Sequence, residues 1–234
     1  MPLTITSIAG GAPKPVFDKL GPKFEQRTGY RLNALYDTMS GIAGRVTAHE
    51  AIDVLVMPVP LIDAYVKDGT VQAAGRAKLA IIGLGVGVKD GGNVPDVSTP
   101  DALREALLAA HAVVHAPPSA TPSGAQSDKV FKELGIANAM TGRVVHKAGL
   151  AGGVAMIASG EAGLGIFPKS EIVNAKGVAL AGPLPPQLQL NIVYGAGIVA
   201  ASPVAGPAAE FIRFLIEPES RKVWTTCGFD APGA

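Results

Sequence analysis

The stretch AKLAIIGLGVGVK, residues 77–89, decides how this chain is organised. Its apolar side chains are sufficient for one long extended strand. A second run of similar length and apolar content, LQLNIVYGAGIVA, occupies residues 188–200. Alternating strand and helix patterns precede the first run and fill the segment between the two. We therefore interpret the two runs as crossover strands that carry the chain into a second lobe and back, with a ligand-binding cleft between the lobes.

The alternation on each side of the first run predicts the fold class. Strand patterns at residues 3–8, 30–36 and 52–57 are each followed by a helix pattern. In the later segment, helices are expected at residues 125–134 and 149–159. Such alternation is typical of a parallel sheet covered by helices. The prediction is an α/β protein of two Rossmann-like lobes joined by two crossover strands, with residues 1–80 and 195–234 in one lobe and 85–185 in the other.

Composition excludes several classes of protein. Apolar residues make up 48% of the chain and charged residues 17%, which excludes a disordered chain. The net charge is only +1 and no basic cluster occurs, so nucleic acid is not an expected partner. No apolar run is long enough to insert into a membrane. Cys227 is the single cysteine, and no zinc spacing, P-loop or dinucleotide fingerprint appears, so neither a metal nor a cofactor is expected.

The amino-terminal segment MPLTITSIAGG bears on location. It has no basic region and passes directly into a strand pattern, so it is not a secretory signal. The sequence as it stands predicts a cytoplasmic protein, or a periplasmic one if a signal peptide has been removed. For an exported chain the expected partner is a membrane transporter, and in either location the expected ligand is a small anion.

Four loops share one pattern, in which a strand ends and a helix begins with small or hydroxyl residues. They are residues 9–14, 37–41, 119–124 and 147–152. Ligands bind beyond the carboxyl ends of parallel strands, and helix amino termini favour anions. Any one loop, taken alone, is also explained as an ordinary helix cap or turn. The predicted ligand-binding residues are Gly10, Gly11, Thr38, Met39, Ser40, Ser119, Thr121, Ser123, Ala151 and Gly152.

Two residues are candidates for a catalytic base. Asp37 precedes the turn at residues 38–40, where it could cap the following helix or act as a proton acceptor. His146 ends a strand pattern beside Lys147, and its alternative is a structural histidine. No Ser-His-Asp order accompanies either residue.

Longer stretches resemble a known family. They are LGPKFEQRTGYRL (residues 20–32), AIDVLVMPVPLIDAYVKDGTV (51–71), IASGEAGLGIF (157–167) and AGPLPPQLQ (181–189). Over its whole length the chain resembles the type II periplasmic binding proteins, in the molybdate-binding-like branch of solute-binding proteins. The resemblance implies two α/β lobes that close by hinge motion around a ligand.

The chain departs from this family where molybdate binders use two serines. The first loop reads Ala9-Gly10-Gly11-Ala12 and has no hydroxyl, and Met39 stands at the second serine. The ligand expected from these departures is therefore an organic carboxylate rather than a tetrahedral oxyanion. The alternative function is a cofactor-free isomerase of unsaturated di- or tricarboxylates acting by proton transfer, because the branch includes enzymes similar to aconitate isomerase.

Overall fold

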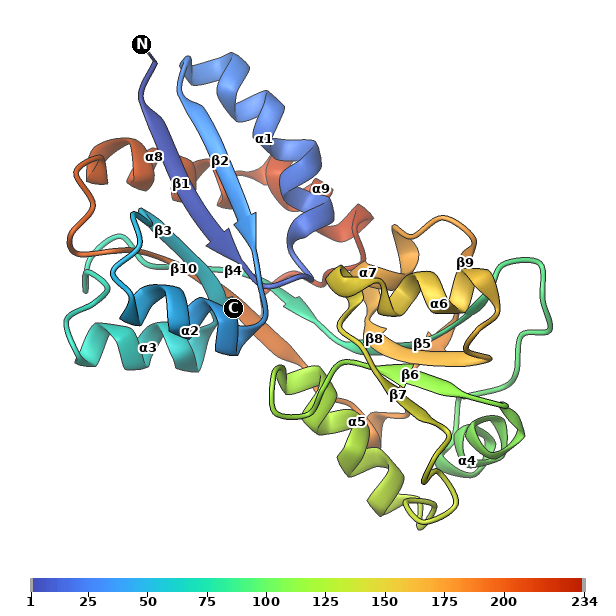
Figure 1. Ribbon diagram of the computed structural model, residues 1–234. Coiled ribbons are helices and arrows are strands. Elements are labelled where there is room, and N and C mark those ends of the chain that lie inside the picture. The colour runs from blue at the N-terminus through green and yellow to red at the C-terminus, as the bar shows by residue number, and fades with distance from the viewer. Residues whose placement is uncertain (1, 233–234) are drawn as a thin grey trace. The chain divides into compact units, whose positions relative to one another are not determined.

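The structure is a computed structural model that describes residues 2–232, and it divides into two compact lobes (Figure 1). Lobe 1 comprises Met1–Ile82 and Ile192–Ala234, and lobe 2 comprises Gly83–Asn191. Each lobe contains one five-stranded sheet with helices. The predicted α/β class with two lobes is confirmed.

Lobe 1 is built on a sheet with strand order β2-β1-β3-β10-β4, in which β1 runs parallel to β2 and β3 while β10 is antiparallel to its neighbours. Its strands are β1 (Thr4–Ala9), β2 (Arg31–Tyr36), β3 (Val54–Pro58), β4 (Ala77–Ile82) and β10 (Ile192–Ile198). Its helices are α1 (Lys14–Thr28), α2 (Met39–Thr47), α3 (Val59–Lys67), α8 (Ala205–Ile216) and α9 (Pro218–Thr226).

Lobe 2 repeats this topology, with strand order β7-β6-β8-β5-β9 and β5 as the antiparallel strand. Its strands are β5 (Leu84–Lys89), β6 (Val113–His115), β7 (Val144–His146), β8 (Leu164–Pro168) and β9 (Val178–Pro183). Its helices are α4 (Pro100–Ala109), α5 (Pro122–Glu133), α6 (Gly153–Ser159) and α7 (Lys169–Val173), with 3-10 turns η1 (Gly149–Ala151) and η2 (Pro186–Leu188).

Apolar side chains hold the helices to both faces of each sheet. In lobe 1, Ile42 of α2 and Ile62 of α3 pack with Leu55 and Met57 of β3 on one face. Aromatic side chains of α1, α8 and α9 pack against one another in a separate group, in which the ring centres of Phe17 and Phe211 lie 5.6 Å apart. In lobe 2, α4 and α5 share one apolar cluster with the sheet, and α6 and α7 share another. Each sheet thus has an apolar layer of helices on both faces.

The prediction of one continuous strand over residues 77–89 is wrong. The run divides at Gly83 into β4 and β5, which belong to different sheets. The side chain of Gln189 binds the first residue after this break. Its Oε1 accepts from the Leu84 N–H at 2.7 Å, and its Nε2 donates to the Leu84 carbonyl at 3.0 Å. The matching run at 188–200 is a strand only over β10, because its first part completes η2 and binds Leu84.

Two predicted helices of lobe 2 also differ from the structure. The helix expected at 125–134 begins earlier, because Thr121 caps it and Pro122 fits its first position. The helix expected at 149–159 is interrupted at Gly152, whose φ of 93° separates η1 from α6. Ser123 therefore lies in the first turn of a helix rather than in a loop.

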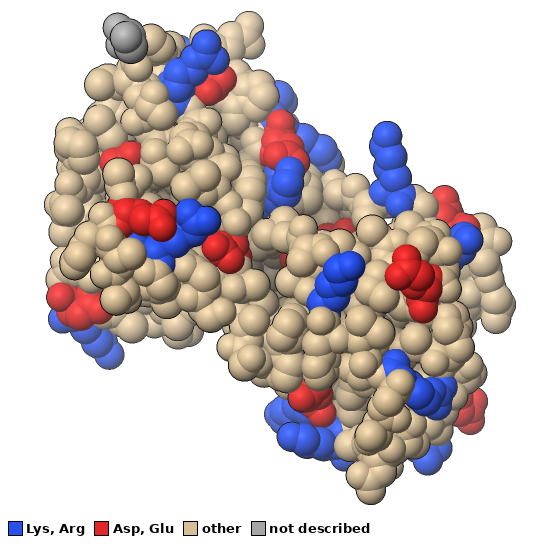
Figure 2. All heavy atoms as spheres, viewed as in Figure 1, with Lys and Arg blue, Asp and Glu red and all other residues tan. Residues whose placement is uncertain are grey.

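No helix within residues 2–232 has the length and apolar character needed to cross a bilayer. Figure 2 shows basic and acidic side chains interspersed on the viewed face, with broad uncharged surface around them. This distribution agrees with the small net charge of +1.

Candidate functional site

In lobe 1 the loops after β1 and β2 lie side by side. Ala9 and Tyr36 are partners in the parallel ladder, and the Asp37 N–H donates to the Ala9 carbonyl at 3.1 Å. A Cβ on Gly10 would stand 2.8 Å from the Met39 methyl carbon and 2.9 Å from the Tyr194 hydroxyl. The first loop, the start of α2 and β10 therefore converge at the carboxyl edge of this sheet.

The start of α2 presents a group of polar donors. Thr38 is the N-cap, and its Oγ1 accepts from the Gly41 N–H at 3.2 Å and lies 3.1 Å from Ser40 Oγ. Among the described residues, the N–H groups of Met39 and Ser40 have no backbone partner. Free N–H groups and hydroxyls at the positive end of a helix dipole suit an anion.

The start of α5 in lobe 2 has the same local geometry. Thr121 is the N-cap, and its Oγ1 accepts from the Gly124 N–H at 3.0 Å and lies 3.1 Å from Ser123 Oγ. Each lobe thus carries one helix start of sequence Thr-x-Ser-Gly, at residues 38–41 and 121–124. Close approach requires glycine at Gly124, since a side chain would overlap the Ala116 and Pro117 carbonyls, whereas a side chain at Gly41 would meet the movable Asp37 carboxylate.

A second loop of lobe 2, residues 147–152, carries a cation. Lys147 N–H donates to the His115 carbonyl at 2.9 Å, which places this loop beside the end of β6. Lys147 is exposed, and its Nζ lies 3.6 Å from where a Cβ on Gly152 would be. Within the described part of the chain its ammonium has no ion-pair partner, so it is available to an anion.

Glu171, in the first turn of α7, faces the same loop. Its Oε2 fills the space that a side chain at Gly149 would need. The residue as a whole is half-buried, and its carboxyl group has no hydrogen-bond or ion-pair partner within residues 2–232. Burial raises the pKa of Glu171 to about 7. A carboxyl group that titrates near neutrality can accept and return a proton.

Comparison with known proteins decides the family. A family model described as "Bacterial extracellular solute-binding protein" matches residues 5–230. This chain belongs to that family. It is 25% identical over 227 residues to an aconitate isomerase from Pseudomonas sp, covering 94% of this chain and 84% of the relative.

Solved structures of other binding proteins confirm the fold of this solute-binding protein. The periplasmic molybdate-binding protein of Azotobacter vinelandii aligns with a TM-score of 0.83 at 17% identity, over 98% of this chain and 100% of its own. The sulfate-binding protein SubI of Mycobacterium tuberculosis H37Rv aligns with a TM-score of 0.75 at 21% identity, over 97% of this chain and 86% of its own. The expected periplasmic-binding-protein fold is thus confirmed.

In this solute-binding protein, three of the predicted ligand residues have backbone N–H groups that already donate hydrogen bonds within the fold. Gly10 N–H donates to the Val56 carbonyl at 3.3 Å, and the N–H groups of Ala151 and Gly152 each donate at 3.0 Å within η1 and its flanks. The prediction that these three N–H groups bind ligand is therefore not supported. In the first loop Gly11 remains a predicted ligand residue; its carbonyl accepts from Lys14 N–H at 3.0 Å. Ser119 is exposed in the turn before α5.

Of the two predicted bases, Asp37 is held by hydrogen bonds and His146 lies near another carboxylate. Asp37 accepts from Thr38 N–H at 2.8 Å and from Arg45 Nε at 3.1 Å, so each carboxylate oxygen already accepts one hydrogen bond. Thr38, not Asp37, provides the helix cap. His146 ends β7, and its Nε2 lies 4.0 Å from Asp128 Oδ1. Neither geometry favours a base acting on a ligand at the Thr-x-Ser-Gly starts.

Sequence reasoning missed Glu171 because nothing near it in the sequence marks it. It follows β8 in the segment Pro168-Lys169-Ser170-Glu171, which has neither the glycines nor the clustered hydroxyls of the four predicted loops. Its raised pKa comes from burial by residues distant in sequence. The Thr-x-Ser-Gly repeat was visible in the sequence, as TMSG and TPSG.

Proposed function

We propose that this protein binds a small organic anion carrying carboxylate groups. The observation that carries the proposal is the Thr-x-Ser-Gly helix start, present once in each lobe with matching hydrogen bonds. Each start offers two hydroxyls, and the N–H of the serine is free of backbone partners within residues 2–232. Both features stabilise a carboxylate.

The surroundings of the lobe 1 start favour a ligand with a carbon skeleton over a compact oxyanion. The Met39 methyl group and the Tyr194 side chain, its hydroxyl nearer than its ring edge, both lie against Gly10, and the first loop itself provides no hydroxyl. The charge of Arg45 is offset by its ion pairs with Asp37 and Glu50. A methyl group beside neutral polar groups suits a carboxylate attached to carbon, and supports weak binding of molybdate and sulfate.

Calorimetric titration of the full chain tests this proposal. Citrate and the aconitate isomers should bind more tightly than molybdate or sulfate. Ser40→Ala and Ser123→Ala should each cost about 1.5–3 kcal/mol of binding free energy, because each removes a hydrogen bond to a charged group.

Thr47→Ala is the matched control for these hydroxyl deletions. Thr47 lies at the other end of α2, where its hydroxyl donates to the Ala43 carbonyl at 2.9 Å. The Thr47→Ala variant should bind carboxylates with the same affinity as the unaltered chain. Molybdate binding tighter than that of every carboxylate tested would contradict the proposal.

A second function, isomerisation of an unsaturated tricarboxylate, is favoured by Glu171 and by the relative named aconitate isomerase. In this reaction a base takes a proton from a carbon next to the double bond, the double bond shifts, and the proton returns to the far carbon of the allylic unit. No oxidant or cofactor is needed. We propose Glu171 for the proton transfer and Lys147 for stabilising the negative charge that develops.

Proton exchange separates this function from binding alone. Incubation with aconitate in deuterated water, followed by NMR, should show deuterium entering the ligand. Glu171→Gln should abolish this exchange and leave carboxylate binding in place, whereas Glu161→Gln, which alters an exposed carboxylate of the same lobe, should preserve it. Absence of exchange with the unaltered chain, at ligand saturation, would assign the protein to binding only.

The expected partner of the protein depends on which of the two functions it has. An exported chain that binds without exchange would pass its ligand to a membrane transporter. An isomerase needs no such partner. Recovery of the protein from the periplasmic or the cytoplasmic fraction of its native cell would test the transporter as partner, because only an exported chain can deliver a ligand to it.

A further inference from the structure

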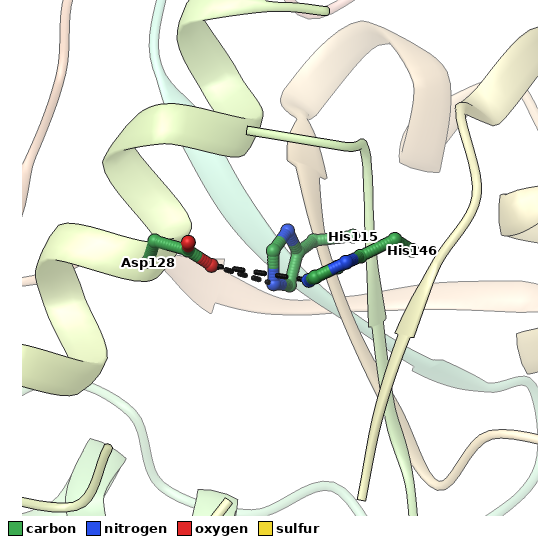
Figure 3. A group of neighbouring side chains, drawn as sticks. All are labelled: His115, Asp128 and His146. Atoms are coloured by element: carbon green, nitrogen blue, oxygen red, sulfur yellow. Dashed lines mark ion pairs between the residues drawn. The ribbon is translucent and has the colours of Figure 1, made fainter. Parts of the chain in front are cut away.

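Three side chains of lobe 2 gather away from the Thr-x-Ser-Gly start, and neither proposed function uses them. His115 ends β6, His146 ends β7, and Asp128 projects from the middle of α5 (Figure 3). The two histidines are partners in the parallel ladder, so their side chains emerge next to each other. Each residue offers one ligand atom, and the three atoms all lie within 4.8 Å of one another.

His115 is the buried member, and its hydrogen bonding leaves one nitrogen unsatisfied. The side chain has no exposed surface, and Nδ1 lies 2.8 Å from the Ala116 carbonyl oxygen. A carbonyl only accepts, so Nδ1 carries the proton and Nε2 presents a lone pair. That Nε2 is buried without a hydrogen-bond partner in the described structure. Burial also lowers the pKa of His115, which favours the neutral ring.

The unsatisfied nitrogen faces a carboxylate. His115 Nε2 lies 3.4 Å from Asp128 Oδ1, and His146 Nε2 approaches the same oxygen to 4.0 Å. A lone pair held 3.4 Å from a carboxylate oxygen is unfavourable unless a cation lies between them. An ion with bonds of about 2.0–2.1 Å in tetrahedral geometry holds its ligand atoms about 3.3 Å apart. Half-exposed His146 can close the remaining gap by rotating its side chain.

We propose that His115, Asp128 and His146 form a binding site for a divalent transition-metal ion, with Zn²⁺ as the fitting example. Two imidazoles exclude Mg²⁺ and Ca²⁺, which prefer oxygen ligands, and one carboxylate completes a three-residue set that leaves a fourth position for water. The Ala116 carbonyl is the outer partner that orients His115. A surface pocket of about 280 Å³, bordered by Asp128, His146 and Thr141, gives access.

Metal bound here would join the ends of β6 and β7 to α5. Thr121 and Ser123 lie in the cap and first turn of that helix, and Lys147 follows His146 directly. The ion would therefore fix the two loops of lobe 2 without contacting the ligand. No zinc spacing appears in the sequence, because the three ligands come from two strands and a helix that meet only in the folded lobe.

The test is titration of the chelator-treated full chain with ZnCl₂ by calorimetry. We expect one ion per chain, and at least about tenfold weaker binding for Asp128→Asn and His146→Ala, since even loss of an outer partner costs about 10–100-fold. Both altered residues are partly exposed, so these variants should fold, which circular dichroism will verify. His111→Ala is the matched control, because His111 is exposed in the same lobe and lies outside the cluster.

Two further measurements locate the ion. Co²⁺ should give the visible absorption bands of a tetrahedral nitrogen–oxygen site, and these should be lost in Asp128→Asn. Zn²⁺ should raise the thermal midpoint of the unaltered chain and of His111→Ala but not of His146→Ala. Absence of Zn²⁺ binding, or equal binding by Asp128→Asn, His146→Ala and the unaltered chain, would overturn the proposal. Neither result depends on carboxylate binding.

Discussion

Replacing Gly124 by alanine should destabilise the protein by about 1–3 kcal/mol and weaken carboxylate binding with it. The added Cβ would overlap the Ala116 carbonyl oxygen and lie 2.5 Å from the Pro117 carbonyl oxygen. Both contacts are with backbone, which cannot rotate away, so the start of α5 must shift and the loop ending β6 must move with it. Urea unfolding and calorimetric titration with citrate measure the two effects.

Gly44→Ala in α2 is the control for this substitution. Nothing lies within 4 Å of a Cβ at Gly44, and its φ is not in the left-handed region. Alanine there should stabilise the helix by about 0.5–1 kcal/mol, because glycine costs that much in a helix interior. If Gly124→Ala unfolded at the same urea concentration as Gly44→Ala, the tight packing described for the Thr-x-Ser-Gly start of lobe 2 would be wrong.

Glu171→Gln should stabilise the protein at pH 8 by up to about 3 kcal/mol, and far less at pH 4. Burial raises the pKa of Glu171 from its ordinary 4.5 to about 7. The folded chain therefore holds this proton more tightly than the unfolded chain does. The stability it provides is complete below pH 4.5 and is lost as the pH rises through 7. Glutamine does not titrate and avoids this loss. Because Glu171 is partly exposed, 3 kcal/mol is an upper limit.

Chemical unfolding of both chains between pH 4 and pH 8 measures this difference. Glu161→Gln provides the baseline for removing a negative charge from the surface of lobe 2. A stability difference between Glu171→Gln and the unaltered chain that stays constant across this range would show that Glu171 has an ordinary pKa, and would remove the main support for proton transfer by this residue.

The fold was predictable because its signals are local. Apolar strand patterns, Gly and Pro punctuation and the two long runs were sufficient to predict an α/β chain in two lobes. The division at Gly83 was not predictable from the run itself, because apolar residues continue on both sides of Gly83 and no proline or charged residue marks the break. The strand divides there because β4 pairs in one sheet and β5 in the other, and because the Gln189 side chain binds Leu84 at the start of β5.

The candidate site was predictable only in part. Hydroxyls beside glycines identified Thr38, Ser40, Thr121 and Ser123 correctly as residues of helix starts, because capping depends on nearby sequence. Whether an N–H is free depends on neighbours in space, as Gly10 and Gly152 show. The same holds for Glu171 and for His115, whose properties arise from burial and from residues on other elements.

The pairing of Ile82 with Ile192 shows how the chain is assembled from modules. These two residues are partners in the antiparallel ladder of β4 and β10, so lobe 1 is complete on either side of the segment Gly83–Asn191. Lobe 2 is in effect a domain inserted at the tip of a β-hairpin, with its own ends tied together by Gln189 and Leu84. Insertions whose ends lie close together disturb their host little. Substitutions in lobe 2 can therefore accumulate with little effect on how lobe 1 folds.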